Sequence, residues 1–342
     1  MKKTILFFIN FILPISFCFA DDSNSIGVIA KSEGINFGFA VNYNSLKNDR
    51  KYQDIIKKQA TIIVPTNELK WSNIHPQKNI YDFSKSDYII DFAVKNNIKV
   101  RGHTILWHAR IPNYITDITN PNELKIQINE HIKNVIGRYK GKIESWDVVN
   151  EVINPPDKQP NGLRNSYWYK MLGEEYIDIA FKQAHKTDPS AILFYNEWGV
   201  EFDTNWSEDK RNKVIALIKR LKARGVPITG FGIQSHISSN NINFVNSKLD
   251  NFIDNLKELG LKVYITELDI KNSNNISNTD ISLAYKKYLN IVLKKNKVDA
   301  VLIWGVYTKR KSDTYVLFDD SGNYNLNYFE VKNTFPYVNK YN

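Results

Sequence analysis

The sequence is poor in cysteine. Cys18 is the only one among 342 residues, and it lies in the apolar N-terminal segment. A single cysteine excludes an intramolecular disulfide and a cysteine-based metal site. If the N-terminal segment is removed, no thiol remains to act as a nucleophile. Residues 21–342 must then be held together by their core, and about 320 residues in one domain bury enough surface for this.

Long hydrophobic runs are also missing beyond the N-terminus. The chain begins with Lys2 and Lys3, continues with an apolar run over 5–19, and reaches Ala20 just before Asp21. A basic start, a short apolar run and a small residue before a polar stretch are typical of a secretory signal peptide. We expect cleavage after Ala20, a mature domain over 21–342, a secreted or periplasmic location, and no membrane attachment after cleavage.

Acidic residues are also fewer than basic ones. The formal net charge is +10, and loss of Lys2 and Lys3 lowers it to +8. The lysines are spread over segments such as 213–222 and 285–297 rather than gathered in one patch. Nucleic-acid binding needs a concentrated basic patch with groups that read bases, so no nucleic-acid partner is expected.

Apolar strand-like runs alternate with amphipathic helical stretches along the whole chain. Repeated strand–helix units indicate a parallel sheet, and eight of them in this length most simply close into a single α/β domain, a (β/α)8 TIM barrel. An open doubly wound sheet is the alternative, but residues 34–38 lack its Gly-rich first turn. The predicted strands are 37–43, 61–65, 98–107, 143–149, 191–195, 228–235, 261–267 and 300–304; the predicted helices are 45–59, 84–96, 121–140, 166–187, 207–225, 246–260, 280–297 and 327–335.

Two of the predicted strands end in carboxylates. In the stretch 261–270, Glu267 and Asp269 are two residues apart and therefore project to the same side. Glu151 ends the apolar stretch 143–151 in the same way. Acids after buried strands are costly unless they are paired or take part in chemistry. Two carboxylates that face one cleft are what glycoside hydrolysis requires.

The other strand ends supply amides, imidazoles and indoles. Barrel active sites lie at the carboxyl ends of the strands, so these groups should line the same cleft. Indole faces pack against sugar rings, while amides and acids bond hydroxyls, so the composition indicates a carbohydrate cleft. The strand-end segments are NELKW at 67–71, RGHTILWH at 101–108, WDVVNE at 146–151, NEW at 196–198, QSH at 234–236, TELD at 266–269 and WGVY at 304–307.

These segments, in this order, resemble glycoside hydrolase family 10, the family of retaining β-1,4-endoxylanases. The resemblance runs from about residue 37 to residue 335. It implies that Glu267 is the nucleophile and Glu151 the acid/base, without a cofactor. His236, held by Asp269, would supply a positive partner that keeps Glu267 ionised. Burial and the charge of Glu267 would favour the protonated form of Glu151.

The resemblance also assigns binding roles. Asn150 and Gln234 match the amides that bond the sugar 2-hydroxyl, so Asn150 also supports catalysis. Contacts on the glycone side, which holds the sugars before the cleaved bond, match Asn67, Lys70, His103, Trp107 and Trp304. Two further indoles, Trp71 and Trp146, fit either the core or the cleft. His103 and His108 lack a third ligand at a fitting spacing, so no metal site is expected.

Three positions depart from the family pattern. The family has glutamate where Thr66 stands and tryptophan where Ser312 stands, and its Asn-Asp-Tyr-Asn becomes NEWG at 196–199. We expect more room on the glycone side, and more positive charge near Lys309, Arg310 and Lys311. These changes would suit a hexose-containing or acidic polysaccharide. Replacement of the lost indole by a neighbour such as Tyr307 or Tyr315 is the opposing interpretation.

The leading hypothesis is a secreted, monomeric, retaining endo-β-1,4-glycanase, of endo-1,4-β-xylanase type, whose partner is xylan or a related β-1,4-glycan. One alternative is the same mechanism on a hexose-containing or acidic β-linked polysaccharide. Another, from a different class, is a polysaccharide-binding protein that has lost turnover. Glu151, Glu267, Asn150, Gln234 and His236 are all retained, which favours the enzyme. A metal-dependent barrel hydrolase lacks the ligands it would need.

Overall fold

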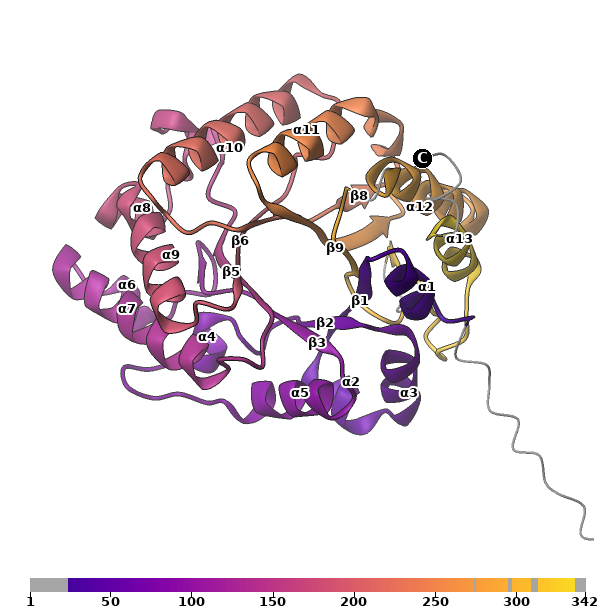
Figure 1. Ribbon diagram of the computed structural model, residues 1–342, viewed down its shortest axis with the longest axis horizontal. Coiled ribbons are helices and arrows are strands. Elements are labelled where there is room, and N and C mark those ends of the chain that lie inside the picture. Colours follow the sequence, from indigo (N-terminus) through magenta and orange to yellow (C-terminus); the bar gives the residue numbers. More distant parts are fainter. Residues whose placement is uncertain (1–23, 274, 295–296, 309–312, 336–342) are drawn as a thin grey trace, which may run out of the picture.

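The predicted barrel is confirmed. The computed structural model describes residues 24–273, 275–294, 297–308 and 313–335. Eight parallel strands form a closed ring, because β10 pairs with both β9 and β1 (Figure 1). In ring order these strands are β1 (Asn36–Val41), β2 (Ile62–Pro65), β3 (Lys99–Gly102), β5 (Ser145–Asn150), β6 (Ile192–Glu197), β7 (Gly230–Ile233), β9 (Lys262–Lys271) and β10 (Ala300–Ile303).

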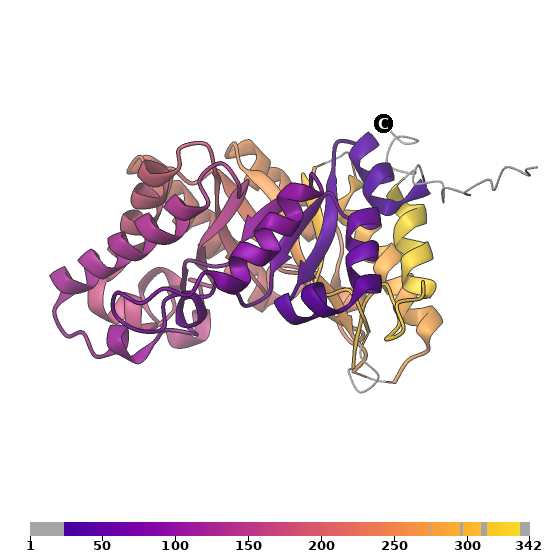
Figure 2. The ribbon, with the colours of Figure 1, turned by 90° about the horizontal axis from the view of Figure 1, so that it is seen from below.

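Helices surround the ring on all sides and leave its two ends open to loops, as Figures 1 and 2 show. They are α1 (Ile26–Ser32), α2 (Tyr43–Asn48), α3 (Arg50–Gln59), α4 (Trp71–Ile74), α5 (Ser84–Lys95), α6 (Asn113–Thr116), α7 (Pro121–Arg138), α8 (Tyr167–Leu172), α9 (Glu175–Thr187), α10 (Asn205–Ala223), α11 (Ser247–Glu258), α12 (Asn278–Val292) and α13 (Leu326–Thr334). No helix in the described part of the chain is long and apolar enough to cross a membrane.

Two predicted helices are each split in two. The stretch 45–59 breaks at Asp49, whose backbone is extended and whose carboxylate accepts a hydrogen bond from Tyr52 N, so that α3 begins there. The stretch 166–187 breaks at Gly173, which has a φ of 59°. The helix expected from Ser207 begins earlier, because the Thr204 side chain accepts from Ser207 N and caps α10. The helix α1 was not predicted.

One predicted strand is also divided, and another is followed by a short strand that was not predicted. The stretch 98–107 forms β3 and the short strand β4 (Leu106–Trp107). The stretch 228–235 gives β7, and β8 (His236–Ser238) then pairs with the far end of β9. Because His236 pairs with Asp269 in this ladder, β9 continues to Lys271. Glu267 and Asp269 therefore lie within a long strand rather than after its end.

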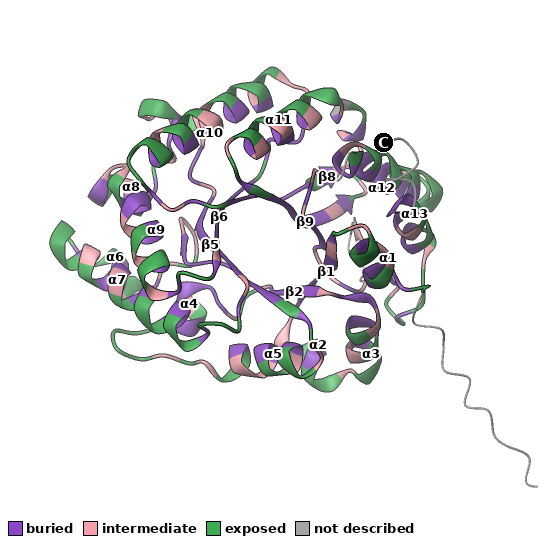
Figure 3. Cartoon of the chain, in the orientation of Figure 1, coloured by how far each residue is buried: buried purple, intermediate pink, exposed green. Residues whose placement is uncertain are grey.

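The core has two parts. The larger lies between the strands and the helices, and the inner faces of the helices are buried while their outer faces are exposed (Figure 3). The smaller fills the barrel interior with Ala40, Ile62, Val64, Phe194, Tyr264, Ala300 and Leu302. Arg101 lies above this interior cluster, 4.2 Å from the Phe194 ring centroid, and forms a buried ion pair with Asp147. This charged pair marks the level at which the barrel interior becomes polar.

Candidate active site

A cavity of about 460 Å³ lies at the carboxyl ends of the barrel strands. Its lining contains every residue predicted from the sequence for the site except Asn67 and Asp269, which line an adjoining cavity. The lining residues are Lys70, His103, Trp107, His108, Asn150, Glu151, Arg164, Trp198, Gln234, His236, Glu267 and Trp304. Segments that are up to 234 residues apart in the chain thus meet in one pocket, as the closed barrel requires.

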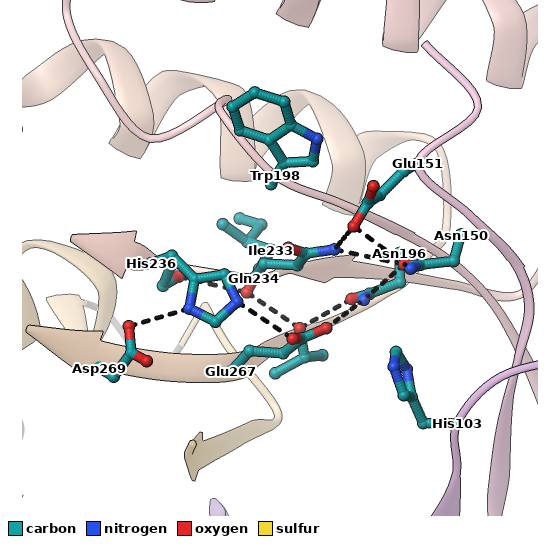
Figure 4. Close-up of polar contacts among 12 residues, drawn as sticks. His103, Asn150, Glu151, Asn196, Trp198, Ile233, Gln234, His236, Glu267 and Asp269 are labelled. Atoms are coloured by element: carbon teal, nitrogen blue, oxygen red, sulfur yellow. Dashed lines mark hydrogen bonds and ion pairs between the residues drawn. The ribbon is translucent and has the colours of Figure 1, made fainter. Parts of the chain in front are cut away.

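Glu267 is the most deeply placed carboxylate of the pocket, with 5% of its surface exposed. Asn196 Nδ2 lies 2.8 Å from Glu267 Oε1 and donates to it, and His236 Nε2 lies 3.2 Å from Oε2 (Figure 4). Burial alone would raise the pKa of Glu267. The His236 hydrogen bond and the charges of the neighbouring imidazoles, together with the Asn196 bond, instead lower that pKa to about 2. Glu267 is therefore ionised over the whole range in which proteins commonly work.

His236 connects two carboxylates. Its Nδ1 lies 2.9 Å from Asp269 Oδ1, on the side of the ring opposite Glu267. Desolvation opposes the charged imidazolium, but the bonds to Asp269 and Glu267 raise the pKa of His236 well above its ordinary value. The expected partnership of these three residues is thus present in the geometry.

Glu151 stands where β5 gives way to a loop, and its φ is 58°, in the left-handed region that non-glycine residues seldom adopt. Its backbone N–H donates to Asn196 O at 2.9 Å. Gln234 Nε2 lies 3.1 Å from Glu151 Oε1 and donates to it. This backbone turn directs the carboxylate of Glu151 over the pocket, as Figure 4 shows.

The two glutamates are joined through side-chain amides. Gln234 links to Glu151, Asn196 links to Glu267, and both amide groups also contact Asn150, at 3.3 Å and 2.9 Å from its Oδ1. Gly232 leaves room for this arrangement, because a Cβ at that position would lie 2.1 Å from Asn196 Oδ1. The amides fix the two carboxylates relative to each other on one side of the cavity.

Two residues beside Glu151 had no role assigned to them from the sequence, although His108 belongs to a segment that was expected to line the cleft. Arg164 Nε donates to Glu151 O at 2.6 Å, and Arg164 Nη2 lies 3.8 Å from Glu151 Oε2. His108 Nδ1 lies 3.6 Å from the same carboxylate oxygen, and burial lowers the pKa of His108 to about 4, so the ring is neutral near pH 7. Arg164 follows an irregular loop without a strand signal, so the sequence pattern gave no reason to place it here.

The predicted glycone contacts touch one another in two groups. Lys70 Nζ donates to Asn67 Oδ1 at 3.1 Å and lies 5.1 Å from the centroid of the Trp107 ring. His103 is held by Asp147 at 2.9 Å and packs edge-on against Trp304, with ring centroids 5.6 Å apart. Of the two indoles left open by the sequence, Trp71 and Trp146 are both buried, so they belong to the core.

A second cavity, of about 830 Å³, adjoins the first and shares Lys70 and Trp304 with it. Thr66 contributes to its wall, and the Thr66 hydroxyl donates to Val41 O at 3.2 Å. Asp269 and Asp320 bring carboxylates to the same wall. Four residues of this region, Lys309, Arg310, Lys311 and Ser312, lie outside the described residues. The positive charge expected from the three basic ones therefore stays a prediction.

Within the described ranges, no group of three or more His, Cys, Asp or Glu side chains is arranged to hold a metal ion. The chemistry that the pocket offers is that of an ionised, buried carboxylate facing a second carboxylate on a polar network. Aromatic rings line the same space. This combination suits attack on, and proton donation to, a glycosidic bond.

Comparison with known proteins agrees with this chemistry. A β-1,4-xylanase of Dictyoglomus thermophilum is 38% identical over 304 residues, which cover 82% of this chain and 83% of that protein. Endo-1,4-beta-xylanase B of Thermotoga neapolitana is 33% identical over 329 residues, 92% of each chain. The crystal structure of xylanase 10B from Thermotoga maritima superposes with a TM-score of 0.82 and 32% identity, covering 91% of this chain and 98% of that one.

The sequence profile of glycosyl hydrolase family 10 matches residues 25–334, which is nearly all of the described chain. The match includes both strands that carry the paired glutamates and every other residue of the pocket. The chain therefore belongs to glycosyl hydrolase family 10 and is a glycoside hydrolase.

Proposed function

We propose that the chain is a retaining endo-1,4-β-xylanase in which Glu267 is the nucleophile and Glu151 the acid/base. The observation that carries the proposal is that Glu267, ionised and bonded by His236 and Asn196, shares one polar pocket with Glu151. Both relatives are named as xylanases, which supports xylan as the substrate. The glycone-side residues are those expected to bind sugar: Asn67, Lys70, His103, Trp107, Gln234 and Trp304.

In the first step, a Glu267 carboxylate oxygen attacks the anomeric carbon of the sugar before the cleaved bond. Glu151 donates its proton to the glycosidic oxygen, so the departing chain leaves as a neutral alcohol. The bond from the anomeric carbon to that oxygen breaks as the ester to Glu267 forms. Preorganised donors around Glu267 need little rearrangement during this step.

In the second step, Glu151 removes a proton from a water molecule, whose oxygen attacks the anomeric carbon. The ester bond breaks and its electron pair returns to the Glu267 carboxylate. Formation of the ester has neutralised Glu267, which favours the ionised form of Glu151 that this step needs. Two inversions give retention of the anomeric configuration.

We also propose that residues 1–20 direct export and that 21–342 form a secreted or periplasmic monomer. The basic start and apolar run of the N-terminus support export. N-terminal sequencing of the protein recovered outside the cytoplasm would begin at Asp21. Recovery of the intact N-terminus from the cytoplasm would contradict the proposal.

The substrate is tested by product release on a panel of polymers: glucuronoxylan, arabinoxylan, soluble cellulose, mixed-linkage glucan, mannan and an acidic exopolysaccharide. Glu267→Ala is the blank. Xylans cleaved best, with a blank that releases nothing, are the expected result. Release by the blank at the rate of the wild type would contradict the assignment of Glu267.

A second candidate is the same chemistry on a β-1,4-linked hexose polymer. It is favoured by the 830 Å³ cavity beside the pocket and by Thr66, which is smaller than the family's glutamate. An acidic polymer has less support, because the described wall of this cavity carries Asp269 and Asp320. Soluble cellulose or mixed-linkage glucan cleaved better than every xylan would favour this candidate. Binding of a polymer without turnover would favour the non-catalytic protein.

A further inference from the structure

Trp198 stands at the end of β6, beside Glu151 and Gln234, and Figure 4 shows its indole above both. It lines the pocket and is 37% exposed, which is unusual for so large an apolar side chain. The predicted glycone contacts Lys70, Trp107 and Trp304 line the same pocket, while the Trp198 ring packs against Trp206 and Lys210. An exposed indole beside the acid/base offers a flat surface to the sugar that follows the cleaved bond.

A buried ammonium group supports this indole from within the protein. Lys210 Nζ lies 4.4 Å from the centroid of the Trp198 ring and 5.3 Å from that of Trp206. The Lys210 side chain is fully buried. A desolvated cation over an aromatic face is attracted to it more strongly than a cation exposed to water. This contact favours one orientation of the Trp198 ring.

The charge of Lys210 is balanced by Glu197, also fully buried, whose Oε1 lies 2.9 Å from the ammonium nitrogen. The same oxygen accepts from Trp198 N at 3.1 Å. The other oxygen, Oε2, accepts from Ile153 N at 3.1 Å and from the Tyr195 hydroxyl at 2.5 Å. Ile153 follows Glu151 by two residues. One carboxylate thus ties the loop of Glu151 to the loop of Trp198.

Gly199, the residue after Trp198, allows the Trp206 ring to pack close to the backbone at this turn. Gly199 has a φ of 72°, and a Cβ there would lie 2.5 Å from Cη2 of Trp206. Glycine therefore lets the Trp206 ring pack against the turn that presents Trp198. The departures from the family at 197–199 are coupled through Lys210 and Trp206 rather than independent.

We propose that the buried Lys210–Glu197 ion pair is a positioning element for the aglycone side of the cleft. It holds Trp198 as a stacking surface for the first sugar beyond the cleaved bond, in register with Glu151. Neither Lys210 nor Glu197 touches the substrate, so both act through Trp198 and the loop of Glu151. The inference rests on the proposed xylanase activity, because it concerns the leaving end of a xylan chain.

Two substrates distinguish an effect on aglycone binding from an effect on the catalytic steps themselves. Xylotetraose places sugars on both sides of the cleaved bond, whereas 2,4-dinitrophenyl β-xylobioside places none on the aglycone side. With so good a leaving group, hydrolysis of the enzyme ester limits kcat, and no aglycone sugar takes part in that step. Trp198→Ala should lower kcat/KM on xylotetraose about tenfold, and kcat on the aryl glycoside by much less.

The ion pair is removed as a unit by Lys210→Met with Glu197→Gln, because loss of one partner would leave the other charge buried alone. This double variant should lower kcat/KM on xylotetraose about fivefold. When Trp198→Ala is already present, the same double change should cause little further loss, since the ion pair acts through that ring. Lys219→Met, an exposed position on the same helix, is the control for loss of a lysine.

Thermal melting of each variant shows whether it is folded, and Lys210→Arg is used if the double variant is not. Retention of the cation in Lys210→Arg should preserve most of the xylotetraose activity. Equal losses on both substrates, or losses that add fully to that of Trp198→Ala, would overturn the positioning role. A wild-type protein that cleaves neither substrate would instead refute the proposed function, so the two failures are distinguishable.

Discussion

His236 Nε2 lies 3.2 Å from Glu267 Oε2, and this contact makes the buried carboxylate an anion. Asp269 Oδ1 lies 2.9 Å from the other ring nitrogen, so only the doubly protonated imidazolium donates a hydrogen bond to both acids at once. The ion pair between His236 and Glu267 explains how a carboxylate that is only 5% exposed remains ionised. The same contact connects Glu267 to β8, which pairs with the part of β9 that extends beyond the barrel rim.

Replacement of His236 should move the acid limb of activity. His236→Gln keeps a hydrogen-bond donor but removes the cation, so the pKa of Glu267 should rise from about 2 toward its ordinary value of 4.5. Activity needs ionised Glu267 and should then decline at a higher pH than in the wild type. The measurement is kcat/KM on an aryl β-xylobioside between pH 3 and pH 7.

The control is His185→Gln, an exposed histidine on α9 that has no part in the pocket. Its pH profile should match that of the wild type. An unchanged acid limb in His236→Gln would show that the imidazole does not hold Glu267 in its ionised form.

Removal of Arg164 should impair the action that we propose for Glu151 without unfolding the protein. The Arg164 guanidinium donates to the carbonyl of Glu151, whose backbone has the unfavourable φ of 58°. A hydrogen bond from a charged donor contributes about 1.5–3 kcal/mol, so Arg164→Met should lower kcat/KM by roughly 10- to 100-fold if that stabilisation is lost from the reactive geometry. The measurement is steady-state kinetics on xylan, with the melting temperature as the test of folding.

Arg138→Met, at a partly exposed ion pair with Asp87 on the outside of the barrel, is the matched control and should keep its activity. Activity of Arg164→Met within about twofold of the wild type would mean that the turn at Glu151 is held without Arg164.

Replacement of Thr66 tests whether this residue widens the glycone side of the cleft. Thr66→Glu places in the 830 Å³ cavity the carboxylate that the family usually has, which fills space and adds a hydrogen-bond acceptor for sugar hydroxyls. The ratio of kcat/KM on xylotetraose to kcat/KM on cellotetraose should increase about tenfold. Thr279→Glu, exposed at the start of α12, is the control. A ratio that stays constant would show that Thr66 does not set this preference.

Two buried histidines should make the fold sensitive to acid. His75 and His131 face each other with their Nδ1 atoms 3.2 Å apart, and His131 stacks on Trp71 at 3.7 Å. Burial lowers the pKa of His75 from 6.5 to about 4, and burial also holds the pKa of His131 well below its ordinary value. The unfolded chain binds more protons than the folded one below pH 6.5, so the free energy of unfolding should fall as pH decreases from 6.5 toward 4.

Urea unfolding at a series of pH values measures this slope, and His75→Phe should reduce it. An unchanged slope in His75→Phe, with the variant folded at pH 7, would assign the acid sensitivity to other groups.

The alternation of apolar runs and amphipathic stretches was enough to predict the barrel, because each strand–helix unit carries its own signal. Element ends were harder to predict. The cap of α10 lies at Thr204, before the expected Ser207, and β9 continues past Glu267 because β8 pairs with it. The cap at Thr204 is a local signal three residues before the expected start, whereas the extension of β9 depends on its pairing with a distant segment.

The predicted site residues come together because each followed a strand and all parallel strands end on one side of the ring. Arg164 and Lys210 could not be predicted this way. Arg164 lies in a loop between short turns, and Lys210 lies in a lysine-rich helix where a charged residue normally faces solvent. Only the packing of α10 against the end of β6 buries that lysine beside Glu197 and Trp198.

The measurement that tests the central claim most directly is a proton NMR time course of xylan cleavage by the purified mature chain. It follows the anomeric configuration of the new reducing ends before mutarotation, with Glu267→Ala as the blank. We expect β-anomers to be released first and the blank to release none. Initial release of α-anomers, or no release above the blank, would contradict it.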